Sequence, residues 1–225
     1  MKPTLALFDL DHTLLDGDSD VLWCDFLMDR GVLDRAAFAA RNAAMERDYK
    51  AGTVSVQAFS SFYVSTLAGR SPAQWQPLRQ AFLDEVVAPR IGPAARRLVR
   101  GQQQAGALVV LTTATNRFLT ELTAQDLGIQ HLIATDCEVA ADGTFSGQTQ
   151  GALNMREGKV VRMHAWLAAR GQTLADFDSW AYSDSANDLP LLGAVQHAVA
   201  VRPDARLAAE AAQRGWPTLR LHGAA

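Results

Sequence analysis

The chain has 225 residues, of which 48% are apolar and 20% charged, the balance of a globular protein that can bury a substantial core. Its formal net charge is −3, with acidic and basic residues mixed along the sequence, which argues against a binder of nucleic acids or membrane surfaces. No stretch reaches the roughly 18 apolar residues of a membrane span, and the apolar run before Asp9 is too short for a signal peptide. We therefore expect a cytoplasmic protein. Cys24 and Cys137 share no ligand-like spacing, and we expect two buried free thiols, with a disulfide as the alternative.

The first 88 residues predict one buried strand followed only by helices. Residues 4–8 form a compact apolar run that ends at acidic residues, as a fully buried strand does. From about residue 18 to residue 88 the apolar residues recur at helical spacing, and Asp34, Ser55 and Ser71 stand at expected helix N-caps. We therefore predict an all-helical domain over residues 18–88.

The rest of the chain alternates between strands and helices. Its apolar patterns predict helices over 94–104, 116–127, 160–170, 189–194 and 204–214, and strands over 107–111, 131–134, 179–183, 197–201 and 218–221. Residues 138–149 predict a hairpin with Asp142-Gly143 in its turn. This alternation predicts an α/β fold, a Rossmann-like and mostly parallel sheet with helices on both faces. Its core would comprise residues 1–17 and 89–225, with the all-helical cap domain of residues 18–88 inserted between them.

Two carboxylates follow directly on the first predicted strand. Asp9-Leu10-Asp11-His12-Thr13 begins where that strand ends, and ligands of parallel sheets bind at the carboxyl ends of strands. The two-residue step sends the side chains of Asp9 and Asp11 the same way. Taken alone, the motif is equally typical of a polar turn with an Asx-type cap.

Two further segments carry groups suited to binding phosphate. Thr112-Thr113-Ala114-Thr115 ends a Val-rich strand and opens a helix, so its hydroxyls and backbone amides could cradle a phosphate, although helix capping by Thr115 is an alternative. Lys159 stands near the start of a predicted helix, where the helix dipole disfavours a cation. That position indicates a specific task, and a solvated surface lysine is the alternative.

A last acidic motif, Asp184-Ser185-Ala186-Asn187-Asp188, follows another buried strand. The strand ends would therefore gather four carboxylates, those of Asp9, Asp11, Asp184 and Asp188, in one small region. Two carboxylates about 4 Å apart repel by roughly 4 kcal/mol at an effective dielectric constant near 20, so such a cluster calls for a cation or raised pKa values. Ligands that are all oxygen suit Mg²⁺, which shares its coordination shell with water and a substrate phosphate.

In this order and with this spacing, the four motifs resemble those of the haloacid dehalogenase-like hydrolase superfamily, and specifically its phosphatases with a helical cap after the first motif. The resemblance covers nearly the whole chain. It implies that Asp9 is the nucleophile that becomes a phosphoaspartate and that Asp11 is the acid and base. It further implies a Mg²⁺ site at Asp9, the Asp11 backbone carbonyl and Asp184, and a small phosphorylated metabolite as substrate. The remaining implied roles are phosphate binding by Thr113, Ala114, Lys159 and Asn187, and support of the metal site by Thr13, Ser185 and Asp188.

The presumed cap bears on the choice of substrate. The chain looks like a phosphoserine phosphatase, and Asp18 matches by position the acidic residue that binds the substrate's amino group, with a helix N-cap as its alternative role. The arginine that grips the substrate's carboxylate in those enzymes falls near Tyr63, with no arginine within several residues of it. We therefore expect a substrate with a cationic amine and no carboxylate, such as histidinol phosphate. Phosphoserine stays open because Arg41, Arg47 or Arg70 could reach the site.

Two other functions are compatible with the same motifs. A phosphotransferase or mutase would pass the phosphoryl group from Asp9 to a sugar in place of water. A non-catalytic, Mg²⁺-dependent module that is phosphorylated on Asp9 is the third possibility, but such modules are shorter and need no Asp11. The sequence does not indicate the oligomeric state.

Overall fold

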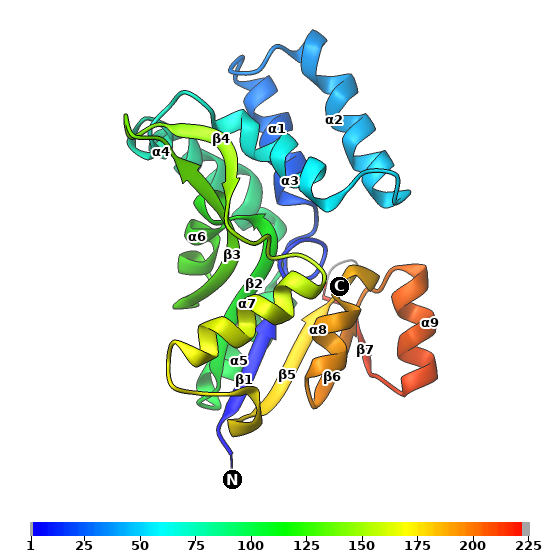
Figure 1. Ribbon diagram of the computed structural model, residues 1–225. Helices are drawn as coiled ribbons and strands as arrows, with labels where there is room; N and C mark the ends of the chain where they lie inside the picture. Colours follow the sequence, from blue (N-terminus) through cyan, green and yellow to red (C-terminus); the bar gives the residue numbers. More distant parts are fainter. Residues whose placement is uncertain (1, 222–225) are drawn as a thin grey trace.

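The computed structural model describes residues 2–221, and its centre is a seven-stranded sheet with the order β4-β3-β2-β1-β5-β6-β7 (Figure 1). All neighbouring strands are parallel except β3 and β4, which form the predicted antiparallel hairpin. The strands are β1 (Thr4–Phe8), β2 (Leu108–Asn116), β3 (His131–Val139), β4 (Phe145–Gln150), β5 (Asp178–Ser183), β6 (His197–Val201) and β7 (Thr218–Leu219). The predicted α/β fold with a mostly parallel sheet is therefore confirmed.

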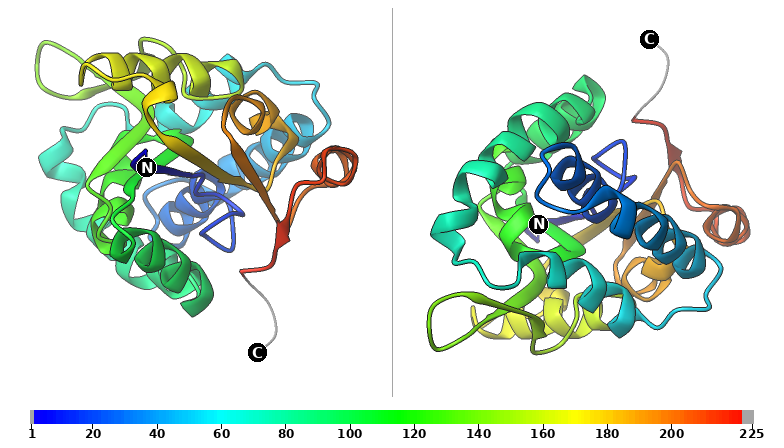
Figure 2. Two further views of the ribbon diagram at one scale, coloured as in Figure 1. Left: turned by 90° about the horizontal axis from the view of Figure 1, so that it is seen from below. Right: turned by 90° about the horizontal axis from the view of Figure 1, so that it is seen from above.

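Helices cover both faces of the sheet, because side chains on a strand alternate between the two faces (Figure 2). Leu5 and Leu7 of β1 pack in a cluster with side chains of α7, α8 and α9, whereas Ala6 and Phe8 pack in a second cluster with side chains of α5 and α6. These helices are α5 (Pro93–Gln104), α6 (Arg117–Asp126), α7 (Glu157–Ala168), α8 (Leu189–Ala194) and α9 (Ala205–Arg214). None of the helices within residues 2–221 is long and apolar enough to cross a membrane.

The segment between β1 and α5 is helical, as predicted. Its α-helices are α1 (Ser19–Asp29), α2 (Arg35–Lys50), α3 (Val56–Val64) and α4 (Pro72–Phe82). Asp34, Ser55 and Ser71 each accept a hydrogen bond from the first turn of the following helix, so these three predicted N-caps are confirmed. Seen from above, α1, α2 and α3 lie over the carboxyl ends of the strands (Figure 2). That arrangement places helical side chains directly above the predicted motifs.

The helical segment shares a hydrophobic core with the sheet. Trp23 of α1 and Trp75 and Phe82 of α4 belong to the same buried cluster as Phe8 of β1 and Leu111 of β2. A smaller cluster around Phe59 and Tyr63 of α3 also contains Cys24 and reaches Met155 of the loop before α7. The helical segment is thus packed against the rest of the chain, and its status as a separate domain with boundaries near 18 and 88 stays a prediction.

Several predicted element boundaries were wrong, most of all in β2. The apolar pattern ended this strand at Leu111, but β2 continues through Thr112, Thr113 and Thr115 to Asn116 and pairs with β3 across a bulge. Threonine is polar but β-branched, and these three side chains are nearly fully buried, so the hydropathy pattern hid a strand that the residue type permits. Helix α6 is consequently capped by Asn116, whose side chain accepts a hydrogen bond from Leu119 N, and not by Thr115.

Candidate active site

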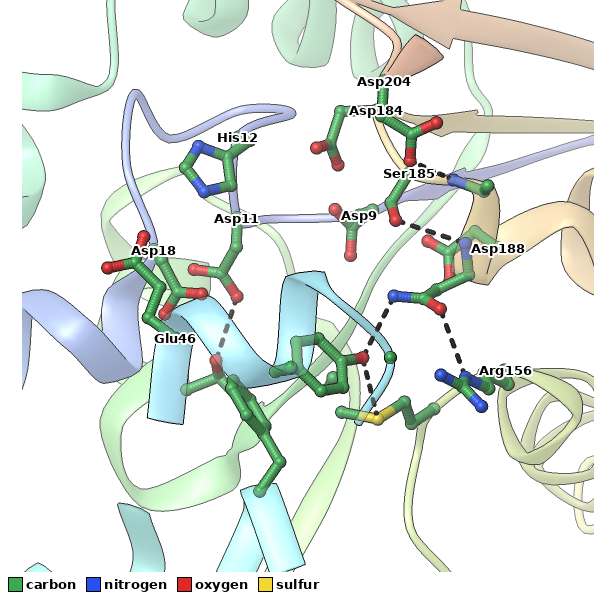
Figure 3. A pocket seen from close by; sticks show the side chains of 18 of the residues that line it. Asp9, Asp11, His12, Asp18, Glu46, Arg156, Asp184, Ser185, Asp188 and Asp204 are labelled. Carbon is green, nitrogen blue, oxygen red and sulfur yellow. Dashed lines mark hydrogen bonds between the residues drawn. The ribbon is translucent and has the colours of Figure 1, made fainter. Parts of the chain in front are cut away.

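The predicted motifs meet in a pocket of about 720 Å³ at the carboxyl ends of the strands. Its lining comes from the end of β2, from the loops after β1 and β5, and from the helices above them. Figure 3 shows Asp9 in the middle of this pocket, with Asp11, Asp18 and Glu46 on one side and Asp188 and Arg156 on the other. All four motif carboxylates, those of Asp9, Asp11, Asp184 and Asp188, line it.

The Asp9 carboxylate is held by donors on both of its oxygens. Lys159 Nζ lies 2.7 Å from Asp9 Oδ1, and Thr13 Oγ1 lies 2.9 Å from Asp9 Oδ2. Lys159 also donates to Asp188 Oδ2 at 2.6 Å, and Ser183 Oγ donates to the same oxygen at 2.7 Å. Asp9 is 7% exposed and Lys159 is 2% exposed, so these contacts are shielded from solvent. A buried carboxylate oriented in this way at a pocket floor is suited to act as a nucleophile.

Negative charge is in excess on this pocket floor, which we define as Asp9, Thr13, Lys159, Asp184 and Asp188. Burial, together with the repulsion between the carboxylates, raises the pKa of Asp9 to about 7 and that of Asp184 to about 8. Burial would lower the pKa of Lys159, but the carboxylates of Asp188 and Asp9 outweigh it and raise that pKa. One ammonium therefore does not balance three carboxylates.

The pocket floor fits a Mg²⁺ ion. Thr13 Oγ1 lies 3.1 Å from Asp184 Oδ1 and 2.9 Å from Asp9 Oδ2, so a single hydroxyl joins the two carboxylates that would bind the metal. Within residues 2–221 no three His, Cys, Asp or Glu side chains converge into a metal cage. Mg²⁺ does not need such a cage, because it binds through one or two carboxylates and keeps water and phosphate oxygens in its shell. A divalent cation between Asp9 and Asp184 would also remove the repulsion that raises their pKa values.

Asp11 lies beside the pocket floor in a set of neutral donors. Its Oδ1 accepts from Ser19 N at 2.7 Å, and its Oδ2 accepts from Thr115 Oγ1 at 2.9 Å and from Thr113 Oγ1 at 3.3 Å. Thr113 is fully buried and does not line the pocket, whereas Ala114 and Thr115 do. The Thr113 hydroxyl, which was predicted to bind phosphate, therefore contacts Asp11, and the pocket is lined by Ala114 and by Thr115, the last residue of the predicted cradle.

Asn187 and Ser185 both line the pocket in the loop after β5. Ser185 Oγ accepts from Asn187 N at 3.2 Å. The Asn187 amide bridges two other elements, because its Nδ2 donates to Tyr49 Oη of α2 at 3.0 Å and its Oδ1 accepts from Arg156 Nε at 3.2 Å. Tyr49 in turn donates to Met155 Sδ at 3.3 Å. These contacts connect α2 with the loop after β5 and the loop before α7 (Figure 3).

One side of the pocket is an acidic wall formed by Asp18, Asp20 and Glu46, which come from the start of α1 and from α2. Burial and the nearby Asp11 carboxylate raise the pKa of Asp18 to about 7, and burial raises the pKa of Asp20 as well. Asp18 also caps α1 by accepting from Asp20 N and Val21 N. Both roles considered for Asp18 are thus compatible with its position, since it caps a helix and faces the pocket.

The structure corrects the remaining substrate residues. Tyr63 is 1% exposed and packs under α1, so it does not line the pocket. Neither do the three arginines proposed to reach the site, because Arg41 lies over Phe38 and Phe62, Arg70 over Trp75, and Arg47 pairs with Asp48. The lining residues that the sequence did not predict include Asp20, Glu46, Tyr49, Phe59, Met155, Arg156, Asp204 and Arg206.

Comparison with known proteins decides the family. The family model for haloacid dehalogenase-like hydrolases matches residues 6–193. The chain belongs to this family. A histidinol-phosphatase of Neisseria meningitidis serogroup C is 40% identical over 96% of this chain and 97% of that protein. A phosphoserine phosphatase of Mycobacterium tuberculosis is 34% identical over 94% of this chain and 68% of that protein.

Two solved structures place this haloacid dehalogenase-like hydrolase among known folds. A protein of unknown function from Bordetella pertussis Tohama I has a TM-score of 0.94 and 42% identity, with 99% of this chain and 100% of that chain covered. A substrate-bound phosphoserine phosphatase has a TM-score of 0.69 at 16% identity, covering 97% and 93% of the two chains, which shows a shared fold. The family predicted from the four motifs is therefore confirmed, and the phosphatase class predicted for the enzyme agrees with the names of its relatives.

Proposed function

We propose that this hydrolase is a Mg²⁺-dependent phosphomonoesterase that works through a phosphoaspartate on Asp9. The observation that carries the proposal is the Asp9 carboxylate itself, which is buried at the pocket floor and fixed by Lys159 on one oxygen and Thr13 on the other. A carboxylate positioned only for structure would not need to face a pocket of about 720 Å³. The cluster of Asp9, Asp184 and Asp188 supports the metal, which when bound would neutralise charge on the phosphoryl oxygens.

In the first step an oxygen of Asp9 attacks phosphorus, and the bond from phosphorus to the ester oxygen breaks. Asp11 gives its proton to that leaving oxygen, which departs as an alcohol. Lys159 and the backbone amides near Ala114 counter the charge of the phosphoryl oxygens. In the second step Asp11 takes a proton from water, the water oxygen attacks phosphorus, and the bond to Asp9 breaks to release phosphate.

The acidic wall supports a cationic substrate, and we propose histidinol phosphate. Asp18, Asp20 and Glu46 face the space that the organic part of the ester would occupy, beside the aromatic rings of Tyr49 and Phe59. These rings stack on each other with centroids 4.0 Å apart, and an aromatic face next to carboxylates suits a planar cation. The relative named histidinol-phosphatase also supports this choice. Phosphoserine is the second candidate, supported by the relative named phosphoserine phosphatase.

Phosphate release from a panel of esters, with and without Mg²⁺, tests the proposal. The panel contains histidinol phosphate, phosphoserine, sugar phosphates and nucleotides, and the Asp9→Asn protein is the control. We expect Mg²⁺-dependent turnover that Asp9→Asn lowers by about 10⁴-fold or more, because the nucleophile is lost. Phosphate transfer to added alcohols that competes with phosphate release would favour a transferase. A phosphoaspartate that persists for minutes without turnover would favour a non-catalytic module.

We also propose that residues 18–88 act as a cap that closes over the bound ester. The support is that α1 and α2 supply the acidic wall, whereas the loops after β1 and β5 supply the pocket floor. Closure would exclude water other than the attacking molecule. Limited proteolysis with and without an inert phosphate analogue tests this, and protection of the link near Gly17 by the analogue is the expected result.

A further inference from the structure

Arg156 occupies a backbone position that ordinarily requires glycine. Gly158 N donates to Met155 O at 2.9 Å, which closes a four-residue turn with Arg156 at its second position. Arg156 has φ 51° and ψ −125°, the geometry of a type II′ turn, in which glycine is strongly preferred because a Cβ is crowded. A non-glycine residue with such dihedral angles costs stability, and strain of this kind tends to persist at functional sites.

The Arg156 side chain faces two adjoining cavities. It lines the catalytic pocket and also a neighbouring cavity of about 490 Å³, and Arg206 of α9 lines both as well. Its Nε donates to Asn187 Oδ1 at 3.2 Å, a contact that fixes the stem of the guanidinium and leaves the terminal nitrogens for other partners. Figure 3 places Arg156 on the opposite side of the pocket from Asp18 and Glu46.

The charge of Arg156 is not balanced in the way that the charge of Lys159 is. Lys159 contacts two carboxylates, those of Asp9 and Asp188, whereas Arg156 donates to the neutral amide of Asn187. Within residues 2–221 no carboxylate lies within ion-pair distance of Arg156. A half-buried guanidinium on a pocket wall with no acidic partner is suited to bind an oxyanion through its planar fork.

We propose that Arg156 is a binding residue for an oxyanion of the substrate or product, and that this role explains an arginine at a glycine position. The proposal rests on the phosphatase function proposed above. The oxyanion has two possible sources, the phosphoryl group as it enters or leaves the pocket, or a carboxylate carried by the organic part of the ester. The shared chemistry is a planar, charged fork facing two anionic oxygens.

The test combines stability with binding, because the two should change in opposite directions. Arg156→Gly relieves the turn, so Tm is expected to stay level or to rise by about 2–4 °C. The same change removes a charge-assisted contact, so KM and the inhibition constant of inorganic phosphate are expected to rise about tenfold or more. Arg156→Lys keeps a charge but loses the planar fork, so its KM and its inhibition constant for phosphate should lie between those of the wild type and those of Arg156→Gly. Arg202→Gly is the matched control, since Arg202 also has a positive φ of 43° but lies outside both cavities.

The choice of ester separates the two sources. An equal rise of KM for histidinol phosphate and phosphoserine, together with weaker inhibition by inorganic phosphate, assigns the phosphoryl group. A rise confined to phosphoserine assigns the carboxylate. The proposal is overturned if Arg156→Gly leaves KM and phosphate inhibition unchanged, or if it lowers kcat and Tm together, as a purely structural role would.

Calorimetric titration with inorganic phosphate tests the oxyanion site at Arg156 independently of the proposed phosphatase activity. It needs no turnover, so weaker phosphate binding by Arg156→Gly than by Arg202→Gly supports the oxyanion site even in a protein that hydrolyses none of the esters. Equal phosphate binding by both variants in an active phosphatase overturns the assignment of the phosphoryl group, and the phosphoserine arm then decides the carboxylate.

Discussion

The pocket floor and the acidic wall face each other across the same space but are built differently. Floor side chains come from strand ends and from the start of α7, and each is held by one or more short contacts, such as the 2.6 Å and 2.7 Å bonds of Lys159. Wall side chains come from helices, and their donors include the backbone amides of the helix that Asp18 caps. The floor pairs two of its carboxylates with the ammonium of Lys159, and the wall brings the carboxylates of Asp18, Asp20 and Glu46 to the pocket.

This difference assigns separate tasks to the two surfaces. A reacting group must be fixed to within a fraction of an ångström, and side chains at strand ends that share a hydrogen-bond network meet that condition. A surface that selects the organic part of an ester needs the right charge and room, and helices can supply both without touching the reacting atoms. The comparison therefore predicts that changes in the floor affect all esters alike, and that changes in the wall affect mainly cationic ones.

Removing the floor's ammonium should have the largest effect on the fold. Lys159→Met leaves the buried carboxylates of Asp9 and Asp188 without their cation, so the free energy of unfolding should fall by about 3–5 kcal/mol, as for other broken buried ion pairs. Urea unfolding measures this loss. Lys2→Met, at an exposed lysine, is the matched control and should change the free energy by no more than about 0.5 kcal/mol. Equal stability of the two variants would show that the floor does not depend on Lys159.

Neutralising the wall should change selectivity and leave the chemistry intact. Asp18→Asn keeps the helix cap, because asparagine caps as well as aspartate does, but removes the charge. We expect kcat/KM for phosphoethanolamine, a cationic ester without a carboxylate, to fall about tenfold, as for loss of a contact to a charged group. For the uncharged ester phenyl phosphate we expect a change of no more than about twofold. Steady-state kinetics with both esters measure this, and an equal fall for both would remove the distinction between wall and floor.

The same preference should depend on pH. Burial raises the pKa of Asp18 to about 7, so its carboxyl group is largely neutral at pH 6 and largely charged at pH 8. The ratio of kcat/KM for phosphoethanolamine to that for phenyl phosphate should therefore increase as the pH rises through 7. Titration of the shared phosphate group cancels in this ratio. In Asp18→Asn the ratio should be flat over the same range, and a wild-type ratio that falls with pH would contradict the assignment.

Most of the pocket floor could be predicted from the sequence, and this prediction succeeded for a physical reason. Each motif follows an apolar run, so the strand ends were visible, and parallel strands bring their carboxyl ends together whatever the loops do. Asp9 and Asp184 were predicted for that reason, Lys159 was predicted from its unusual position near the start of a helix, and all three line the pocket. Thr113 was misjudged because the hydroxyl that faces a pocket is set by the bulge near the end of β2, which no residue pattern indicated.

The wall could not be predicted in the same way. Glu46 of the wall and the nearby Tyr49 belong to α2, which carries no motif and lies about 110 to 140 residues away in sequence from the loops that Tyr49 contacts. Their position depends on how the helical segment packs over the sheet, and that is decided by tertiary contacts of Trp23, Trp75 and Phe82. Asp18 follows closely on the first motif, and it was predicted as a substrate residue from that position. Tyr63 was chosen by ungapped position, and it failed because it faces the core.

The hydrogen bonds of Tyr49, which join α2 to the loop after β5 and to the loop before α7, offer a smaller perturbation. Tyr49→Phe removes the hydroxyl that contacts both Asn187 Nδ2 and Met155 Sδ but keeps the ring that stacks on Phe59. A net hydrogen bond is worth about 1 kcal/mol, so we expect KM to rise about threefold to tenfold for cationic and uncharged esters alike. Tyr182→Phe, in a contact with Gln102 away from the pocket, is the control. A kcat that falls while KM is unchanged would place Tyr49 in the chemistry and not in the contact.

Asp136 lies outside the pocket and shows how two arginine partners change the pKa of an acid. Its substitution has the smallest expected effect on the free energy of unfolding. Burial would raise the pKa of Asp136, but hydrogen bonds from Arg117 and Arg162 outweigh it and lower that pKa below 3.8. Because the folded pKa is depressed, the stabilisation is present above the unfolded pKa of about 3.9 and is lost as the pH falls through the folded value. Asp136→Asn should therefore cost about 1 kcal/mol at pH 7, a value kept low because the side chain is 32% exposed.

Urea unfolding of wild type and Asp136→Asn between pH 7 and pH 3.5 tests this contrast. The difference between the two proteins should be constant down to about pH 5 and should shrink below about pH 4. Asp9 and Asp184 of the pocket floor have raised pKa values, and no arginine among residues 2–221 forms an ion pair with either of them, so their contribution to stability has the opposite dependence on pH. A difference that grew on acidification would show that the Asp136 carboxylate is destabilised in the fold, as those of Asp9 and Asp184 are. Asp136, with its two arginine partners, would then show the same pH dependence of stability as Asp9 and Asp184, and the contrast between the two regions would be lost.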